Sequence, residues 1–168
     1  MLDDAAIERY SRQILLPEVG GRGQERLCAA CVTVSGRDAG AAFAASLLAA
    51  AGVRVVCEDG SLGCLATRLD AVTVVGRTVG AGAVVATLVG RPCADCVSET
   101  VWRLPAAERP VSLDAAQVVG ALVAAETLRA ALGLATAGRV QALDLERGKF
   151  EPRPLPTSDG CAACRVTA

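Results

Sequence analysis

The chain has no histidine, a single lysine (Lys149) and very few aromatic residues, which make up 2% of its 168 residues. Because 52% of the residues are hydrophobic, alanine, valine and leucine must fill the core, and the length suits one domain over residues 1–168. The net charge of −1 gives no electrostatic reason to expect binding to nucleic acid or to an anionic membrane.

Long apolar runs and a secretion signal are also missing. The longest run without a charge, residues 39–53, is too short and too rich in alanine to cross a bilayer. The start of the chain, Met1-Leu2-Asp3-Asp4, is acidic where a secretion signal would be basic. Eight cysteines without such a signal indicate a reducing compartment, where thiols and metal sites are favoured over disulfides. We therefore expect a cytoplasmic protein.

The second half of the chain contains two Cys-x-x-Cys pairs, Cys93 with Cys96 and Cys161 with Cys164. Each pair follows a turn-forming segment, and two such pairs can hold one zinc ion in a closed tetrahedral site, about 2.3 Å from each sulfur. The absence of histidine excludes a site with mixed cysteine and histidine ligands. A redox dithiol and a chance spacing are the alternatives. A four-cysteine site would be structural, because it leaves no coordination position open for chemistry.

The pattern of apolar residues predicts an α/β fold. An amphipathic helix over 4–16 is followed by a glycine-rich break. A strand over 31–35, a glycine turn, a helix over 41–51 and a strand over 53–57 form a βαβ unit, which requires a parallel pair. Residues 58–68 are expected to form a loop. The other predicted elements are strands over 71–75 and 83–89, a helix over 112–132 capped by Ser112 and ended by Gly133, and a hairpin over 139–145 and 149–153.

Segments 8–17 (ERYSRQILLP) and 23–27 (GQERL), with Ala50-Ala51-Gly52-Val53 at the end of the predicted βαβ helix, carry a family resemblance. Together with the cysteine pairs, they resemble the ThiF and MoeB proteins, E1-like enzymes that adenylate the C-terminus of ubiquitin-like sulfur carriers. The resemblance implies a Rossmann-like fold with a mostly parallel sheet, a C-terminal antiparallel hairpin and a zinc clip with four cysteine ligands. It covers both ends of the chain and omits the middle, so the chain resembles a truncated, degenerate member.

The glycine loop after the first predicted strand departs from the Gly-x-Gly-x-x-Gly pattern, in which glycine lets backbone amides approach a phosphate. Gly36, Asp38 and Ala41 stand at the three glycine positions, and Gly40 precedes the last of them. Asp38 puts a carboxylate where a phosphate would lie. Two like charges about 4 Å apart repel by roughly 4 kcal/mol at an effective dielectric constant of 20. The alternative role of Asp38 is to cap the following helix. We expect Gly36, Asp38 and Gly40 to form a degenerate loop that does not bind ATP tightly.

The resemblance also implies parts that are missing from the middle of this chain. Full-length relatives hold ATP with an Asn-x-x-Arg-Gln segment, a lysine for the phosphates and an aspartate for magnesium, and residues 58–90 contain none of these motifs. Because adenylyl transfer depends mostly on charge stabilisation, we expect a non-adenylating protein without catalytic residues. It would act as a binding partner or scaffold in a sulfur-carrier, cofactor or natural-product pathway. The alternative is a residual adenylyl- or sulfurtransferase whose ATP site is completed by a partner subunit.

The expected partners are a second copy, an intact E1-like relative, a ubiquitin-like sulfur carrier or a biosynthetic enzyme. Arg12 matches a family arginine that reaches the partner's ATP, and we place the interaction surface on Arg12 and the helix over 112–132; a plain surface role is the alternative. Glu58 and Asp59 stand where the family places an acidic residue for the ribose, and we expect them to be solvated.

Three further cysteines could carry sulfur. Cys28 and Cys31 form another Cys-x-x-Cys pair, in which we interpret Cys31 as a small core residue and Cys28 as a partly exposed thiol. A redox or persulfide role for this pair is the alternative. Cys64, in the expected loop, is the candidate for sulfur transfer.

Overall fold

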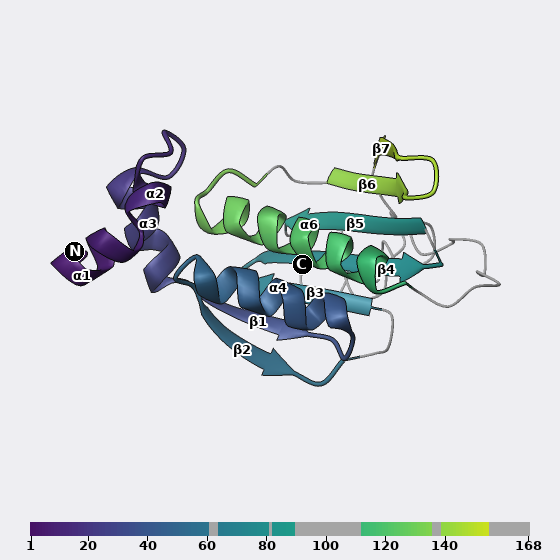
Figure 1. Ribbon diagram of the computed structural model, residues 1–168, viewed down its shortest axis with the longest axis horizontal. Helices are drawn as coiled ribbons and strands as arrows, with labels where there is room; N and C mark the ends of the chain where they lie inside the picture. Colours follow the sequence, from purple (N-terminus) through teal and green to yellow (C-terminus); the bar gives the residue numbers. More distant parts are fainter. Residues whose placement is uncertain (61–63, 81, 90–111, 136–138, 155–168) are drawn as a thin grey trace, which may run out of the picture.

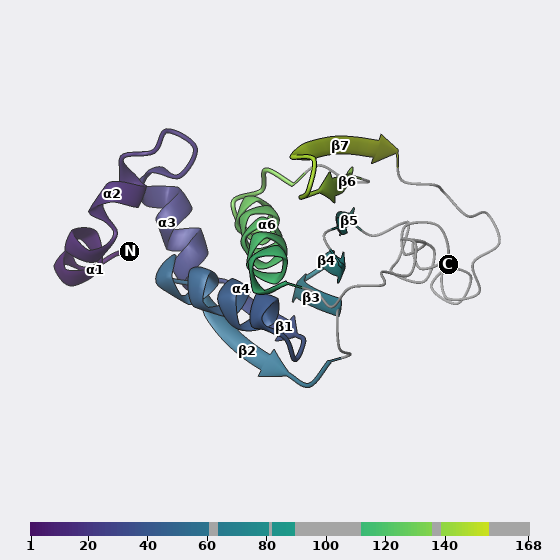
Figure 2. The same cartoon turned by 45° about the vertical axis from the view of Figure 1, so that its right-hand side comes forward.

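The computed structural model describes residues 1–60, 64–80, 82–89, 112–135 and 139–154 (Figure 1). The described elements are, in chain order, α1 (Asp4–Arg9), α2 (Ser11–Ile14), α3 (Gly20–Ala29), β1 (Cys31–Ser35), α4 (Ala39–Ala50), β2 (Arg54–Glu58), β3 (Cys64–Leu69), β4 (Val72–Val79), β5 (Gly82–Val89), α6 (Leu113–Ala131), β6 (Arg139–Asp144) and β7 (Lys149–Pro154). One sheet contains all seven strands, and α4 and α6 lie side by side on one of its faces (Figures 1 and 2). The short helices α1 to α3 extend beyond one end of these layers.

The sheet is mixed and mostly antiparallel, with the strand order β2-β1-β3-β4-β5-β6-β7. Among the described strands, only β1 and β2 are parallel, as the βαβ unit requires, and every other neighbouring pair is antiparallel. The prediction of a mostly parallel sheet is therefore wrong. A parallel neighbour needs a crossover of a dozen or more residues, whereas β3, β4 and β5 follow one another through turns at Asp70 and Gly80. Both turn residues have positive φ angles, 50° and 59°, which are typical of tight hairpins.

Most predicted elements are present, and three are not as expected. Residues 58–68 were predicted to form a loop, but β3 occupies Cys64–Leu69. The opening helix is interrupted at Tyr10, and α3 begins inside the predicted glycine-rich break. The predicted strand over 31–35 and the C-terminal antiparallel hairpin are confirmed.

The main core lies between the sheet and the two long helices, and small residues allow them to pack closely. A Cβ on Gly76 of β4 would lie 2.6 Å from a methyl of Val119 and 2.7 Å from a methyl of Val123. The helices also meet each other at glycines, because a Cβ on Gly40 would lie 2.6 Å from the carbonyl oxygen of Ala116. A Cβ on Gly120 would in turn collide with the Gly40 backbone. This close packing compensates for the lack of large aromatic side chains in the core.

A second apolar cluster forms on the sheet face that α4 and α6 do not cover. It consists of alternate residues of three neighbouring strands, Val75, Val84, Ala86, Leu88, Val140 and Ala142. The strand β5 is thus buried on both faces, which explains its almost continuous apolar sequence.

The zinc clip expected as part of this fold has no counterpart among the described residues. Cys93, Cys96, Cys161 and Cys164 all lie outside them. Within the described ranges, no group of three or more Cys, Asp or Glu residues is arranged to hold a metal ion. The same part of the chain contains no helix with the length and apolar character of a membrane span.

Candidate functional site

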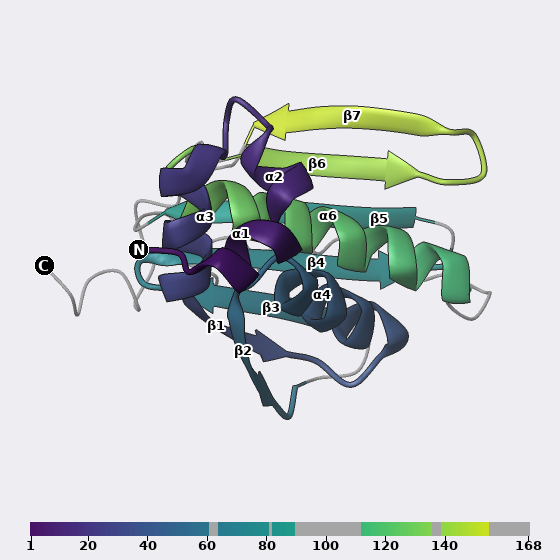
Figure 3. The ribbon, with the colours of Figure 1, turned by 60° about the vertical axis from the view of Figure 1, so that its left-hand side comes forward.

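The loop predicted to be a degenerate nucleotide site connects the end of β1 to the start of α4, at the end of the parallel β1–β2 pair (Figure 3). Asp38 is the N-cap of α4, and its Oδ1 accepts a hydrogen bond of 2.9 Å from the backbone N–H of Ala41. The carboxylate therefore lies at the positive end of the helix, where an anion would otherwise bind. The capping role weighed for Asp38 is confirmed.

The chain that follows β2 packs against the same loop. The Gly36 N–H donates a 3.4 Å hydrogen bond to the carbonyl of Glu58. Gly60 lies so close that a Cβ there would come within 2.6 Å of the Gly36 nitrogen. Dinucleotide-binding loops use glycine so that a phosphate can come near the backbone. In this chain the backbone at Gly60 lies against Gly36 instead.

Gly40, the third residue assigned to the loop, is buried beneath α6. Its neighbours are Ala116 and Gly120 of that helix, at the contact between α4 and α6. Gly40 therefore serves helix packing. The three predicted loop residues do lie together, but each faces a part of the same chain.

The charged side chains around the loop form two exposed ion pairs. Arg37 contacts Asp59 at 2.9 Å, and Arg68 of β3 contacts Glu58 at 2.8 Å. Glu58 and Asp59 are exposed, as expected, and each also has an arginine partner. Lys149 is at the start of β7, and five strand spacings of roughly 4.8 Å separate that strand from β1. No lysine is therefore placed to neutralise a phosphate at this loop.

Three cysteines of the described residues have exposed side chains and form no disulfide. Cys28, Cys31 and Cys57 are all free thiols at the surface, so the prediction that Cys31 is a core residue is wrong. Cys28 accepts a 3.6 Å hydrogen bond from Nε2 of Gln24. Cys64 belongs to β3 instead of the expected loop.

The two N-terminal helices form a weakly attached arm, which we define as residues 4–14 together with Leu15 and Leu16. No residue of α1 or α2 is buried. Leu15 is 81% exposed, Leu16 and Ile7 are about half exposed, and Arg12 is exposed as well. The helices extend away from the sheet, beyond the ends of α4 and α6 (Figure 2). The arm therefore presents apolar side chains and an arginine that its own domain does not cover.

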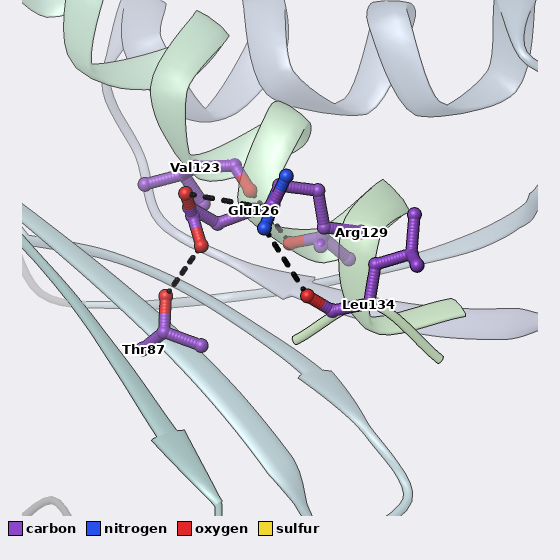
Figure 4. Close-up of polar contacts among 6 residues, drawn as sticks. Thr87, Val123, Glu126, Arg129 and Leu134 are labelled. Carbon is purple, nitrogen blue, oxygen red and sulfur yellow. Dashed lines mark hydrogen bonds and ion pairs between the residues drawn. The ribbon is translucent and has the colours of Figure 1, made fainter. Parts of the chain in front are cut away.

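One polar cluster was not predicted from the sequence. Glu126 of α6 is buried, and its Oε2 accepts a 3.1 Å hydrogen bond from the hydroxyl of Thr87 on β5 (Figure 4). Arg129 lies 4.0 Å from the other carboxylate oxygen and donates to the carbonyl of Leu134 at 3.2 Å. Next to it, the buried hydroxyls of Thr67 and Thr127 are 2.6 Å apart. These bonds join the helix to the sheet. The sequence signal for this cluster was the pair of opposite charges at Glu126 and Arg129, three residues apart on the predicted helix.

The comparisons with known proteins confirm a partial resemblance to E1-like proteins. Over 47 residues, 28% of this chain, the sequence is 60% identical to the adenylyltransferase and sulfurtransferase MOCS3 of Mus musculus. This match covers 10% of that protein. No protein-family profile matches the chain.

A solved structure described as a heterocyclase in complex with substrate and cofactor has a similar fold, with a TM-score of 0.60. The alignment covers 97% of this chain and 28% of the heterocyclase chain, at 15% sequence identity. At this identity the likeness concerns the fold alone. The chain spans a tenth of the first relative and about a quarter of the second.

Proposed function

We propose that this chain is a non-adenylating E1-like domain that acts by binding protein partners in a biosynthetic pathway. The observation that carries the proposal is that the nucleotide loop is filled by the protein itself. Asp38 caps α4, the backbone at Gly60 lies against Gly36, and α6 packs on Gly40. A phosphate at this position would need open space, free amides and positive charge.

The similar proteins support a pathway that makes a natural product, a cofactor or a sulfur carrier. One of them is named for adenylyl and sulfur transfer, and the other is a heterocyclase solved with its substrate. We propose that a related chemistry is carried out by a partner of this chain, either an intact E1-like relative or a biosynthetic enzyme. A ubiquitin-like sulfur carrier is the corresponding small partner.

The N-terminal arm is the surface that we assign to the intact E1-like relative. Its apolar residues Ile7, Leu15 and Leu16 are exposed, and neither of its helices buries a residue in its own domain. Most of α6, which we expected to share in this surface, packs against the sheet and α4. The large hydrophobic residues of that helix that remain exposed are Leu113 and Val118.

Calorimetric titration with Mg-ATP tests the proposal, using the unchanged protein and two variants of Asp38. We expect the unchanged protein to show no binding tighter than about 1 mM, which corresponds to roughly −4 kcal/mol. Asp38→Asn keeps a side chain that can cap the helix and removes the negative charge. Asp38→Gly removes both the cap and the charge. Neither variant should bind tightly, because Gly60 and α6 still fill the loop.

Carrier-dependent exchange of pyrophosphate into ATP provides the catalytic measurement. We expect no exchange by the chain alone. Exchange, or ATP binding below the millimolar range, would overturn the proposal and favour the alternative of a residual adenylyltransferase. If exchange appears only when an intact relative is added, an inactive relative carrying a mutated ATP site shows which subunit performs it.

A further inference from the structure

The strand β2 forms one edge of the sheet, and no described element pairs with its outer side (Figures 1 and 3). In a doubly wound sheet a third strand lies outside the second, in the order 3-2-1-4-5-6. Here β3 pairs with β1 in antiparallel orientation instead, which leaves β2 at the edge. Four of its five residues are exposed, including Val56 at 46%.

The hydrogen bonds of β2 to neighbouring segments of the same chain show which of its backbone groups face outward. The Arg54 N–H donates to the carbonyl of Ala30 at 3.1 Å, and the Glu58 carbonyl accepts from Gly36. Arg54, Val56 and Glu58 therefore direct their backbone groups toward β1. Because these groups alternate along a strand, Val55 and Cys57 direct their N–H and C=O groups to the open side.

The opposite edge of the sheet is protected against a further strand. The edge strand β7 carries Pro152 and Pro154, which have no N–H to donate. Proline occurs on edge strands where the missing N–H faces solvent, and it prevents pairing with another strand. The strand β2 contains no proline, so each of its residues keeps a backbone N–H.

We propose that two copies of the chain associate by antiparallel pairing of their β2 strands about a two-fold axis at Val56. The sequence of this strand, Arg-Val-Val-Cys-Glu, complements itself in this arrangement. Arg54 lies opposite Glu58 of the second copy at both ends, and the two Val56 side chains meet in the centre. Opposite charges and β-branched pairs at facing positions stabilise antiparallel strands. Such a contact is isologous and closes as a dimer.

The hydrogen bonds fit the same register. Val55 lies opposite Cys57 of the second copy, and both have outward-facing backbone groups. Facing residues of this kind exchange two hydrogen bonds, so the two equivalent pairs satisfy all four outward groups of each strand. Val56 occupies the alternate, non-hydrogen-bonded position, where facing side chains are closest. An unrelated extended peptide would satisfy the backbone equally well but would not be selected by the charges.

This inference rests on the proposed binding function and adds the contact between two copies. Its experiments contain no ATP, so their failure would remove this contact without affecting the conclusion about the nucleotide loop.

Sedimentation of the full chain over a range of concentrations tests the pairing. The unchanged protein should form a dimer. Arg54→Glu and Glu58→Arg should each weaken the dimer by about tenfold, because like charges then face each other at both ends. An equimolar mixture of the two variants should dimerise again, since every facing pair is then of opposite charge. Lys149→Glu makes the same change of charge on β7 and should have no effect.

Rescue in the mixture separates the proposal from a loss of folding. Glu58→Arg also removes the ion pair with Arg68, so circular dichroism should first establish that the variant is folded. A variant that only lost structure would not regain a dimer when mixed. If the mixture sediments as the single variants do, the register is wrong.

Cross-linking supplies a second measurement that does not depend on charge. In a Cys57→Ser background, Val56→Cys should form a disulfide across the two-fold axis, because facing Cα atoms at such positions are about 4.5 Å apart. Val55→Cys in the same background is the control, since the two copies of residue 55 are offset by two positions. A strictly monomeric protein at millimolar concentration, or equal cross-linking of both variants, would overturn the proposal. Dimers that survive all β2 changes would also do so.

Discussion

Gly52 and Gln24 join the N-terminal helices to the rest of the domain. Gly52 has a φ of 96° just after α4, where a left-handed residue commonly ends a helix. Gln24 is completely buried, and its Nε2 donates a 2.9 Å hydrogen bond to the carbonyl of Ala51. Nearby, Arg26 donates to the carbonyl of Leu132 at the end of α6. The GQERL segment thus binds the ends of both long helices. This structural role does not depend on ATP.

Replacing Gly52 with alanine should destabilise the protein more than the same change at Gly133. Both glycines have left-handed φ angles, 96° and 77°, where an L-residue costs about 1–2 kcal/mol. A Cβ at Gly52 would also lie 3.0 Å from both Gln24 and Tyr10, whereas at Gly133 the nearest atom is 3.9 Å away. Overpacking of this kind adds roughly 1–3 kcal/mol. The free energies of unfolding in urea measure the difference. Equal losses in the two variants would mean that the contacts around Gly52 relax freely.

At the scale of elements, the β6–β7 hairpin is fixed by its turn. Asp144 Oδ1 accepts from the backbone N–H of Arg147 at 3.0 Å, and its Oδ2 contacts the Arg147 guanidinium at 3.1 Å. The backbone hydrogen bond, followed by the side-chain contact, lowers the pKa of Asp144 below its ordinary value of 3.8. The carboxylate is therefore stabilised in the folded state.

The sign of the pH dependence follows from this lowered pKa. The contribution of Asp144 to stability is present above its unfolded-state pKa and is lost as the pH falls through the folded-state pKa. An NMR titration should give a pKa below 3.8 for Asp144. Arg147→Ala keeps the backbone N–H and should raise the pKa only in part. A full return to the ordinary value would show that the guanidinium, and not the backbone, causes the shift.

The N-terminal arm should be needed for binding and not for folding. Because α1 and α2 bury no residue, the double change Leu15→Ser and Leu16→Ser should alter the melting temperature little. It should weaken binding to an intact E1-like protein of the same organism, measured by calorimetry. Leu134→Ser, a similar change at another exposed leucine, is the control. Unchanged binding by the double variant would remove the arm from the interface.

The sequence predicts the elements of this fold better than their pairing. The strand at 31–35 and the C-terminal hairpin were recognised because apolar runs end at clear turn residues. Strand β3 was missed, since its alternating Leu65, Thr67 and Leu69 follow a segment rich in glycine and charge. Its position beside β1 could not be read from its own pattern. That position depends on the chain after β2 returning across the sheet without a crossover helix.

At the scale of the whole molecule, the state of the nucleotide loop depends on contacts between distant segments. The departure of Asp38 from the Gly-x-Gly-x-x-Gly pattern was visible in the sequence, and so was the absence of a lysine nearby. The approach of Gly60 to Gly36 and the burial of Gly40 under α6 were not, because they join residues 24 and 80 positions apart along the chain. The cap formed by Asp38 could therefore be predicted, whereas the contacts of Gly36 and Gly40 required the tertiary structure.

The strands β5 and β7, which precede the two cysteine pairs predicted to bind zinc, end close to each other in the sheet. Thr87 and Pro154 both pair with Arg139 from opposite sides, so they are two strand spacings, about 10 Å, apart. The chain leaves β5 and β7 at this same end of the sheet. Cys93 follows four residues after Val89, and Cys161 follows seven residues after Pro154. At about 3.3–3.6 Å per extended residue, both pairs can reach one ion.

Zinc binding by Cys93, Cys96, Cys161 and Cys164 remains a prediction from the sequence, and metal analysis tests it. Protein purified without added metal should contain about one zinc per chain. Because the ion would connect the end of β5 to the segment after β7, its removal should lower the melting temperature. Cys93→Ser should reduce both the zinc content and the melting temperature. Cys31→Ser should change neither, since Cys31 is an exposed free thiol at the start of β1. Protein that contains no zinc as purified, or that melts at the same temperature before and after chelation, would contradict this prediction.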